Sequence, residues 1–343
     1  MDTEGPRGGL IPGILRFFVV PLVLVGVSVA LFAGLGALVG QGPPSTHDLL
    51  LRISEGGKNA RWQAAMELSN RVYQGEVDLA RDERLVLSIA EAFRRARVEG
   101  DDPRILRYLS RFLARSPLPA VAPVLEEAVG DGSPDVRMFA AEALAERGDP
   151  AALAVLLPRL SDTDAGVRTI AAWAVPLLAS KGGADAAVAV RPALLRALGD
   201  DAVDVRWNAA LGLARLGAPG GEDQVWQMLH RESVRALVEA GATGGGGILS
   251  VEGADPATPA QLEERVVANA VSAVYLLRDR SMLDGVRRLA EADPSDRVRD
   301  FALKTVAALE EEVARRGPLP QRAPCRAPGG PEAAAVDVTG GRE

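Results

Sequence analysis

The amino-acid sequence predicts an all-α protein: an α-solenoid of about six to seven stacked helix pairs, preceded by one transmembrane helix. Three observations lead to this prediction. A long apolar run stands near the N-terminus, and an alanine-rich segment that begins with arginine recurs along the rest of the chain. Aromatic residues are only 4% of the composition, whereas good helix formers such as Ala, Leu and Arg dominate it.

The N-terminal segment is expected to cross a membrane. Residues 17–39 are almost wholly apolar, and no charged residue occurs from there to residue 46. As a helix, these 23 residues would extend about 35 Å, which exceeds the roughly 30 Å of a hydrocarbon core. We therefore expect an N-terminal tail over residues 1–13, a transmembrane helix over residues 14–40 and a linker over residues 41–47.

A cleaved signal peptide is the alternative for this segment, but its apolar core usually runs only about 7–15 residues. For the orientation, Arg7 and Arg16 precede the run, whereas the next basic residue after it is Arg52. Since basic residues favour the cytoplasmic side, this asymmetry favours a non-cytoplasmic solenoid. Lys58 and Arg61 weigh against it, so both sides of the membrane stay open.

An octapeptide of one type recurs along the chain. RWQAAMEL at residues 61–68 and RWNAALGL at residues 206–213 match at five of eight positions. Three further copies begin at Arg137, Arg168 and Arg299. Counting from the residue before each arginine, small or apolar side chains recur four and eight residues later, and usually also three and seven residues later, which is typical of one face of an α-helix.

Each of these helices is followed by a turn and a second apolar segment. After the copy at Arg137, Asp149 is the predicted N-cap of a second helix and Pro150 its first residue. Adjacent copies lie 31 and 38 residues apart, a spacing typical of stacked helix pairs. Pro158 and Pro176 are expected to kink or end their helices. Second helices are expected near residues 119–129, 150–160, 186–198, 221–230 and 281–291.

A carboxylate stands six residues before each of the five arginines. The predicted structural pairs are Glu55 and Arg61, Asp131 and Arg137, Asp162 and Arg168, Asp200 and Arg206, and Asp293 and Arg299. Two degenerate copies, at Ile105-Leu106 and Val266-Val267, lack both the arginine and the acid. Because the acid falls in the turn before the helix, we expect it to accept N–H groups there and to meet a guanidinium, which can bridge two acceptors.

Together these features resemble the HEAT repeat family, particularly its bacterial PBS-lyase-like subtype. The features are an Asp, a short spacer, Val-Arg, an Ala-rich helix, then Asp-Pro and a second helix. The resemblance covers roughly residues 48–315. It implies an α-solenoid of antiparallel helix pairs that serves mostly as a scaffold for protein contacts.

Two segments depart from the repeat pattern. Residues 236–261 contain four consecutive glycines, which do not suit a packed helix, so we expect an inserted loop between repeats. This loop is either a spacer or a surface for a partner. Residues 316–343 are rich in Pro, Gly and Ala without periodicity and are expected to be a disordered tail.

No catalytic, cofactor or metal site is predicted. The net charge of −7 and the absence of a long basic run argue against a nucleic-acid binder. Cys325 is the one cysteine, and His47 and His230 are far apart, so the sequence offers no disulfide and no metal cluster. The family includes di-iron hydroxylases that need His-Glu pairs, which this chain lacks.

We therefore expect a membrane-anchored, non-catalytic scaffold that binds another protein through its solenoid, with no cofactor and no small-molecule substrate. The expected contact surface is a groove lined by the second helices, with a few arginine and aromatic residues supplying most of the binding energy. The alternative is an enzyme, either a bilin lyase or isomerase of the PBS-lyase-like group or an unrecognised activity.

Overall fold

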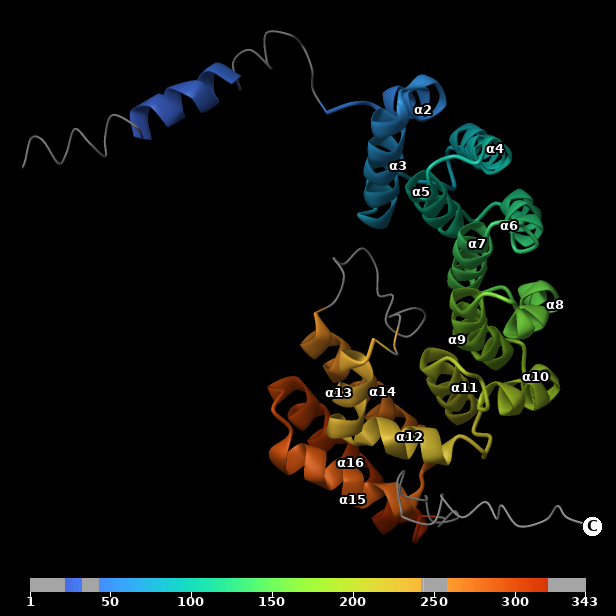
Figure 1. Cartoon of the computed structure of the whole chain (residues 1–343), viewed down its shortest axis with the longest axis vertical. Coiled ribbons are helices and arrows are strands. Elements are labelled where there is room, and N and C mark those ends of the chain that lie inside the picture. Colours follow the sequence, from blue (N-terminus) through green and yellow to red (C-terminus); the bar gives the residue numbers. More distant parts are fainter. Residues whose placement is uncertain (1–21, 33–42, 242, 244–257, 320–343) are drawn as a thin grey trace, which may run out of the picture. The chain divides into compact units, whose positions relative to one another are not determined.

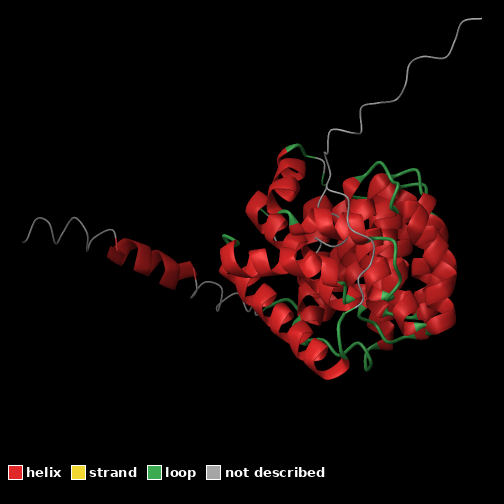
Figure 2. Cartoon of the chain, turned by 90° about the horizontal axis from the view of Figure 1, so that it is seen from below, coloured by secondary structure: helices red, strands yellow, loops and turns green. Residues whose placement is uncertain are grey.

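The computed structural model describes residues 22–32, 43–241, 243 and 258–319. Every regular element within these ranges is helical, and loops join the helices (Figure 2). The predicted all-α class is confirmed. The chain divides into two units, residues 1–64 and 65–343.

The first unit contains α2 (Thr46–Glu55) and the beginning of α3 (Lys58–Tyr73). A capping box starts α2: the Ser45 hydroxyl accepts the Asp48 N–H, and the Asp48 carboxylate accepts the Ser45 N–H. Leu49 and Ile53 give α2 a buried face. Regular helix thus follows the predicted linker, close to residue 48, where the repeats were expected to begin.

The expected transmembrane segment is described only in its middle. Residues 22–32 are helical, and all of them are exposed. Residues 14–21 and 33–40, together with the expected tail over residues 1–13, lie outside the described residues. Within the described part of the chain, no helix combines the length and the apolar character that a membrane crossing needs.

The second unit is built from helix pairs (Figure 1). We call the helices that follow the acid-bearing turns, or their degenerate equivalents, the first helices: α5 (Pro103–Ala114), α7 (Pro134–Arg147), α9 (Ala165–Lys181), α11 (Val203–Arg215), α14 (Pro259–Leu277) and α16 (Asp296–Arg316). The second helices are α4 (Glu83–Glu99), α6 (Ala122–Ala128), α8 (Leu153–Leu156), α10 (Ala184–Ala197), α12 (Glu222–Leu229) and α15 (Arg280–Ala292). The positions expected for second helices are therefore confirmed.

The first helices form a continuous row. Each packs on the next: α5 on α7, α7 on α9, α9 on α11, α11 on α14, and α14 on α16. The paired alanines of the motifs in α7, α9 and α11 allow this packing, since they are fully buried between neighbouring helices. Examples are Ala140 and Ala141, Ala171 and Ala172, and Ala209 and Ala210.

The two rows lie on different sides of this unit. Figure 1 shows α5, α7, α9 and α11 along the inner side of its bend, and α4, α6, α8 and α10 along the outer side. The expectation of a groove lined by the second helices is therefore wrong for these repeats. A partner that enters the bend meets the first helices.

The inserted segment is shorter than expected. An additional helix, α13 (Arg231–Glu239), follows α12, so the first residues of the expected loop 236–261 are helical. Its last residues begin α14, because Thr258 and Gln261 form a capping box. Residues 242 and 244–257 lie outside the described residues, as do residues 320–343 of the expected tail.

The two prolines behave differently. Pro158 lies in a 3-10 helix (Leu157–Ser161) directly after α8 ends at Leu156, as expected. Pro176 does not end its helix, since α9 continues to Lys181. Its ring packs on α11 at Gly212, where an added Cβ would lie 2.5 Å from the Pro176 Cγ. Close packing against the next repeat thus accompanies the proline, and it requires glycine at residue 212.

Replacing Gly212 with Ala is expected to lower the free energy of unfolding by about 1–2 kcal/mol, because overpacking a dense core costs more than the gain in helix propensity returns. Chemical unfolding of the full chain measures this. The matched control is Gly285→Ala in α15, where the nearest atom to an added Cβ is 3.4 Å away. That variant is expected to be neutral or slightly more stable. Equal effects at the two positions would contradict the packing argument.

Candidate functional site

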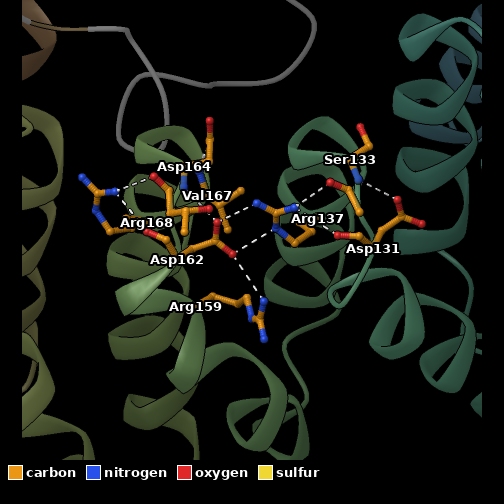
Figure 3. Close-up of polar contacts among 10 residues, drawn as sticks. Asp131, Ser133, Arg137, Arg159, Asp162, Asp164, Val167 and Arg168 are labelled. Atoms are coloured by element: carbon orange, nitrogen blue, oxygen red, sulfur yellow. Dashed lines mark hydrogen bonds and ion pairs between the residues drawn. The ribbon is translucent and has the colours of Figure 1, made fainter.

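Arg137 and Arg168 lie in the first turns of α7 and α9, and the acids Asp131 and Asp162 lie in the turns that lead into these helices (Figure 3). Arg137 shows the arrangement. Its Nη1 donates to the main-chain carbonyls of Asp131 and Gly132, at 3.0 and 3.2 Å. Its Nε and Nη2 donate to the two carboxylate oxygens of Asp162, at 3.0 and 2.7 Å. One guanidinium therefore joins its own turn to the turn of the next repeat.

Arg168 repeats the same contacts one helix pair later. Its Nη1 donates to the carbonyls of Asp162 and Thr163, at 3.0 and 3.3 Å. Its Nε and Nη2 donate to the Asp200 carboxylate, at 2.7 and 2.9 Å. Two parallel N–H···O bonds to one carboxylate are the strongest arrangement that arginine makes. The bridge is thus a property of the repeat and not of one position.

The expected ion pair within each turn is not what the structure shows. Arg206 and Arg299 also donate from Nη1 to the carbonyl of the acid six residues earlier, which is Asp200 or Asp293. The spacing of six was therefore correct for contact, but the acceptor is the main chain. A helical side chain points back toward the N-terminus of its helix, which places the arginine over the carbonyls of its own turn. The turn's carboxylate is then available to another arginine.

In the first unit, the structure places Arg61 differently from the other four arginines. Its Nε donates to the carbonyl of Ile53, at 2.9 Å. The other four arginines donate to the carbonyl of the acid itself, whereas this acceptor precedes Glu55 by two residues. The contact still ties the start of α3 to the end of α2.

The carboxylates also shape the turns. One oxygen each of Asp131, Asp162, Asp200 and Asp293 accepts the N–H two residues later. Such bonds are Asx turns, which hold the backbone in a tight bend. This agrees with the expectation that the acids accept N–H groups ahead of the helix. Each aspartate therefore closes its own turn and also accepts a hydrogen bond from an arginine that precedes it in the chain.

Where a first helix lacks its arginine, another helix supplies one. The degenerate motif of α5 has Leu106, and Arg97 from α4 donates instead to Asp131, at 3.0 Å. The degenerate motif of α14 has Val267, and Arg231 from α13 donates instead to Asp293, at 2.6 Å. No sequence spacing indicated these replacements, because they come from other helices at other distances along the chain.

Both partners of the bridge remain charged. Burial raises the pKa of Asp162, but the hydrogen bond and charge of Arg137 outweigh it and hold that pKa below its usual value. The pKa of Asp200 is lowered in the same way by Arg168. The Asp162 and Asp200 side chains are only 4% and 12% exposed. Saturated, ionised groups of this kind hold structure together and are poor candidates for acid–base catalysis.

A second polar cluster lies late in the first helices, and sequence analysis missed it. We call it the arginine–tyrosine face; its members are Tyr73, Arg107, Arg111, Arg115, Glu142 and Glu146. The Tyr73 hydroxyl donates to Glu146, at 2.6–2.7 Å. The guanidinium groups of Arg111 and Arg115 lie 4.6 and 5.4 Å from the centre of the Tyr73 ring, within cation–π range.

The electrostatics of this face are less balanced than those of the bridges. Burial raises the pKa of Tyr73, and Glu146 raises it further, so the phenol stays a neutral donor. Burial also raises the pKa of Glu142, against the lowering effect of Arg107 and Arg111. Unlike Asp162, Glu142 is thus not fully compensated by its basic neighbours.

One signal in the sequence could have found this face. Arg104, Arg107, Arg111 and Arg115 follow one another at intervals of three and four residues, and no acid interrupts them. Residues at these intervals share one side of a helix. Because other residues separate these arginines, they do not form the dense basic run that indicates phosphate binding.

Cavities and metal ligands point to no further chemistry. A groove of about 550 Å³ lies between the 3-10 helix Leu157–Ser161 and α10, and Arg168 and Asp200 stand at its edge. These two side chains already bind each other. Among the residues that the structure describes, no three His, Cys, Asp or Glu side chains come close enough to hold a metal ion.

The family model for HEAT repeats matches residues 90–176, from α4 through most of α9. We call this matched stretch the HEAT segment, because it is similar to HEAT repeats. It contains two bridging arginines, Arg137 and Arg168, and all of the arginine–tyrosine face except Tyr73. A search among curated proteins finds no match.

Three solved structures are similar at low identity. A crystal structure of an engineered protein is 19% identical, covering 66% of this chain and 97% of that one, with a TM-score of 0.38. Human deoxyhypusine hydroxylase in complex with glycerol is 19% identical, covering 78% and 96%, with a TM-score of 0.33. A second engineered protein is 16% identical, covering 77% and 88%, with a TM-score of 0.32. Likeness at this level assigns no activity.

The bridge can be tested by a double-mutant cycle. Arg168→Ala is expected to cost about 1–3 kcal/mol, because it leaves the largely buried Asp200 carboxylate without its guanidinium. Combined with Asp200→Asn, the two changes should couple by about 1–3 kcal/mol. Chemical unfolding of the four chains measures the coupling. A cycle of Arg168→Ala with Asp162→Asn is the comparison and should show weaker coupling, because Arg168 reaches only the main-chain carbonyl of Asp162. Stronger coupling of Arg168 with Asp162 than with Asp200 would instead indicate an ion pair within the turn.

The lowered pKa values of Asp162 and Asp200 predict loss of stability in acid. A carboxylate with a lower pKa in the folded state stabilises the fold above its unfolded pKa of about 3.9, and this contribution is lost as the pH falls through the folded value. Urea unfolding from pH 2 to 7 should therefore show a steep fall below about pH 4. The double variant Asp162→Asn, Asp200→Asn should have a shallower slope there. An unchanged slope would contradict the assignment.

Proposed function

We propose that the protein is a non-catalytic scaffold that binds another protein through the inner side of its HEAT segment and that residues 14–40 anchor it in a membrane. The observation that carries the binding part is the arginine–tyrosine face on α3, α5 and α7. Arginine and tyrosine are the residue types that most often dominate the energy of protein interfaces. On this face they are partly exposed, and they are held in place by one another.

The arrangement favours binding because the side chains of this face are already restrained before a partner binds. Stacking on Tyr73 restrains Arg111, and the hydrogen bonds to Glu146 restrain Tyr73. A side chain that is already restrained loses less conformational entropy when a partner arrives. Phe139 of α7 and Trp173 of α9 are also partly exposed and would extend an aromatic contact surface along the first helices.

The exposed helix over residues 22–32 supports the anchor. Its leucine, valine and phenylalanine side chains make no buried core, and Phe32 is 80% exposed. An apolar stretch of this kind is unfavourable in water, and a lipid environment would remove that cost. Its flanks in the sequence are equally apolar.

Site-specific photocrosslinking in native membranes tests the proposal. A photoreactive residue at Tyr108, which is partly exposed on α5, is expected to yield one discrete crosslinked protein. The same residue at Arg95, exposed on the outer helix α4, should not. The chain without residues 1–41 is expected to appear in the soluble fraction, still helical. Labelling at both positions alike, or transfer to a small molecule instead of a protein, would count against a scaffold and for the enzyme alternative.

A further inference from the structure

The arginine–tyrosine face has an excess of positive charge. Between residues 103 and 115, the chain has arginine at four positions and no Asp or Glu. Intervals of three and four residues place these arginines on one side of α5. In a chain whose net charge is −7, this side of α5 is a local exception.

Two of the four arginines have no carboxylate partner among the residues that the structure describes. Arg104 is bound by Asp102, at 2.6 Å, and Arg115 lies 3.6 Å from Glu146. No carboxylate within the described ranges comes within 4.0 Å of Arg107 or Arg111. Arg107 is exposed, and Arg111, one helical turn further on, is stacked on Tyr73. Arg111 also hydrogen-bonds the Tyr73 side chain, but a guanidinium has five N–H donors. The face therefore presents two guanidinium groups with donors that no carboxylate of the described residues occupies.

We propose, on the basis of the scaffold function above, that this face binds an acidic segment of the partner protein, whose carboxylates pair with Arg107 and Arg111. The planar guanidinium fits a carboxylate with two parallel hydrogen bonds. Arg107 and Arg111 stand four residues apart on a helix, and glutamates four residues apart on a partner helix have the same separation of about 6 Å. Two such pairs can form together without strain.

Glu142 makes a distinctive contribution to this surface. It faces Arg107 and Arg111 from α7 and carries the like charge of an incoming carboxylate. It therefore opposes the acidic partner while the arginines attract it. Removing its charge should strengthen binding, which is a result that damage to the fold would not produce.

A nucleic acid is the less suitable occupant. Binding along a phosphate backbone depends on neutralising many phosphates, and this face offers two available arginines beside the acidic Glu142 and Glu146. An acidic peptide needs only as many cations as it has contacting carboxylates. The charge pattern therefore favours a protein segment.

The probe is a fluorescein-labelled alanine-based helical peptide of about 16 residues with glutamates four apart, and its control is the same peptide with glutamine. Fluorescence anisotropy with the full chain in non-ionic detergent, at low salt, measures binding.

Arg107→Glu is expected to weaken binding of the glutamate peptide about 10-fold or more, because it replaces attraction with repulsion. Glu142→Gln should strengthen it about 2- to 5-fold. Arg95→Glu on α4 is the matched control and should have an effect of less than about twofold, the range of a remote exposed charge.

Three results would overturn the proposal. They are equal binding of the glutamate and glutamine peptides, unchanged binding in Arg107→Glu, and tighter Arg107-dependent binding of a single-stranded oligonucleotide of the same length. Arg107→Ala is a second variant that removes the charge without reversing it. A helical circular-dichroism spectrum of each variant shows that weaker binding does not result from unfolding. If the Tyr108 crosslink to the native partner persists in Arg107→Glu, the acidic-segment proposal fails and the scaffold stands. If no crosslink forms at Tyr108, the scaffold proposal itself fails.

Discussion

The guanidinium that joins one turn to the next is the contact on which the row of helix pairs depends. A helix pair of some 35 residues buries too little apolar surface to be stable alone, so repeats are stabilised by their neighbours. The alanines of α7, α9 and α11 supply apolar contact but little geometric specificity. Arg137 and Arg168 add it, because four directed hydrogen bonds fix one turn against the next. The low cost of burying these charges follows from the same bonds, which satisfy both partners.

The sequence predicted the helices well because their periodicity is local. Apolar intervals of three and four residues mark α7 or α9 without reference to the rest of the chain, and the turn residues Asp149 and Pro150 mark where a helix pair turns back. The partner of each carboxylate was not predictable in this way. Asp162 is bound by an arginine 25 residues earlier, and Asp293 by one 62 residues earlier. Spacing within one motif contains no information about which neighbour reaches across, since that depends on how the repeats stack.

The bridges between turns and the arginine–tyrosine face are both built from arginine, but they differ in how many of the arginine donors are already hydrogen-bonded. At the start of the first helices, each of the three guanidinium nitrogens of Arg168 donates to a carbonyl or to Asp200. Later in the first helices, no carboxylate in the described part of the chain pairs with Arg107, and Glu142 keeps a raised pKa. A saturated cation contributes to folding and has little left to offer a ligand, whereas an unsaturated one gains when a ligand supplies the missing acceptor. The same residue type therefore stabilises the fold at one end of these helices and has donors left for the proposed partner at the other.

The degenerate repeat bears on the proposed recognition surface of α5. Its motif lacks the bridging arginine, since Leu106 stands in that place, and Arg97 from α4 binds Asp131 instead. The bridge from α5 to the turn before α7 is therefore made by a residue outside α5. The arginines of the α5 row from Arg107 onward do not take part in this bridge, although Arg115 still pairs with Glu146 of α7. The helix that lacks the bridging arginine is thus the one whose other arginines are proposed to meet a partner.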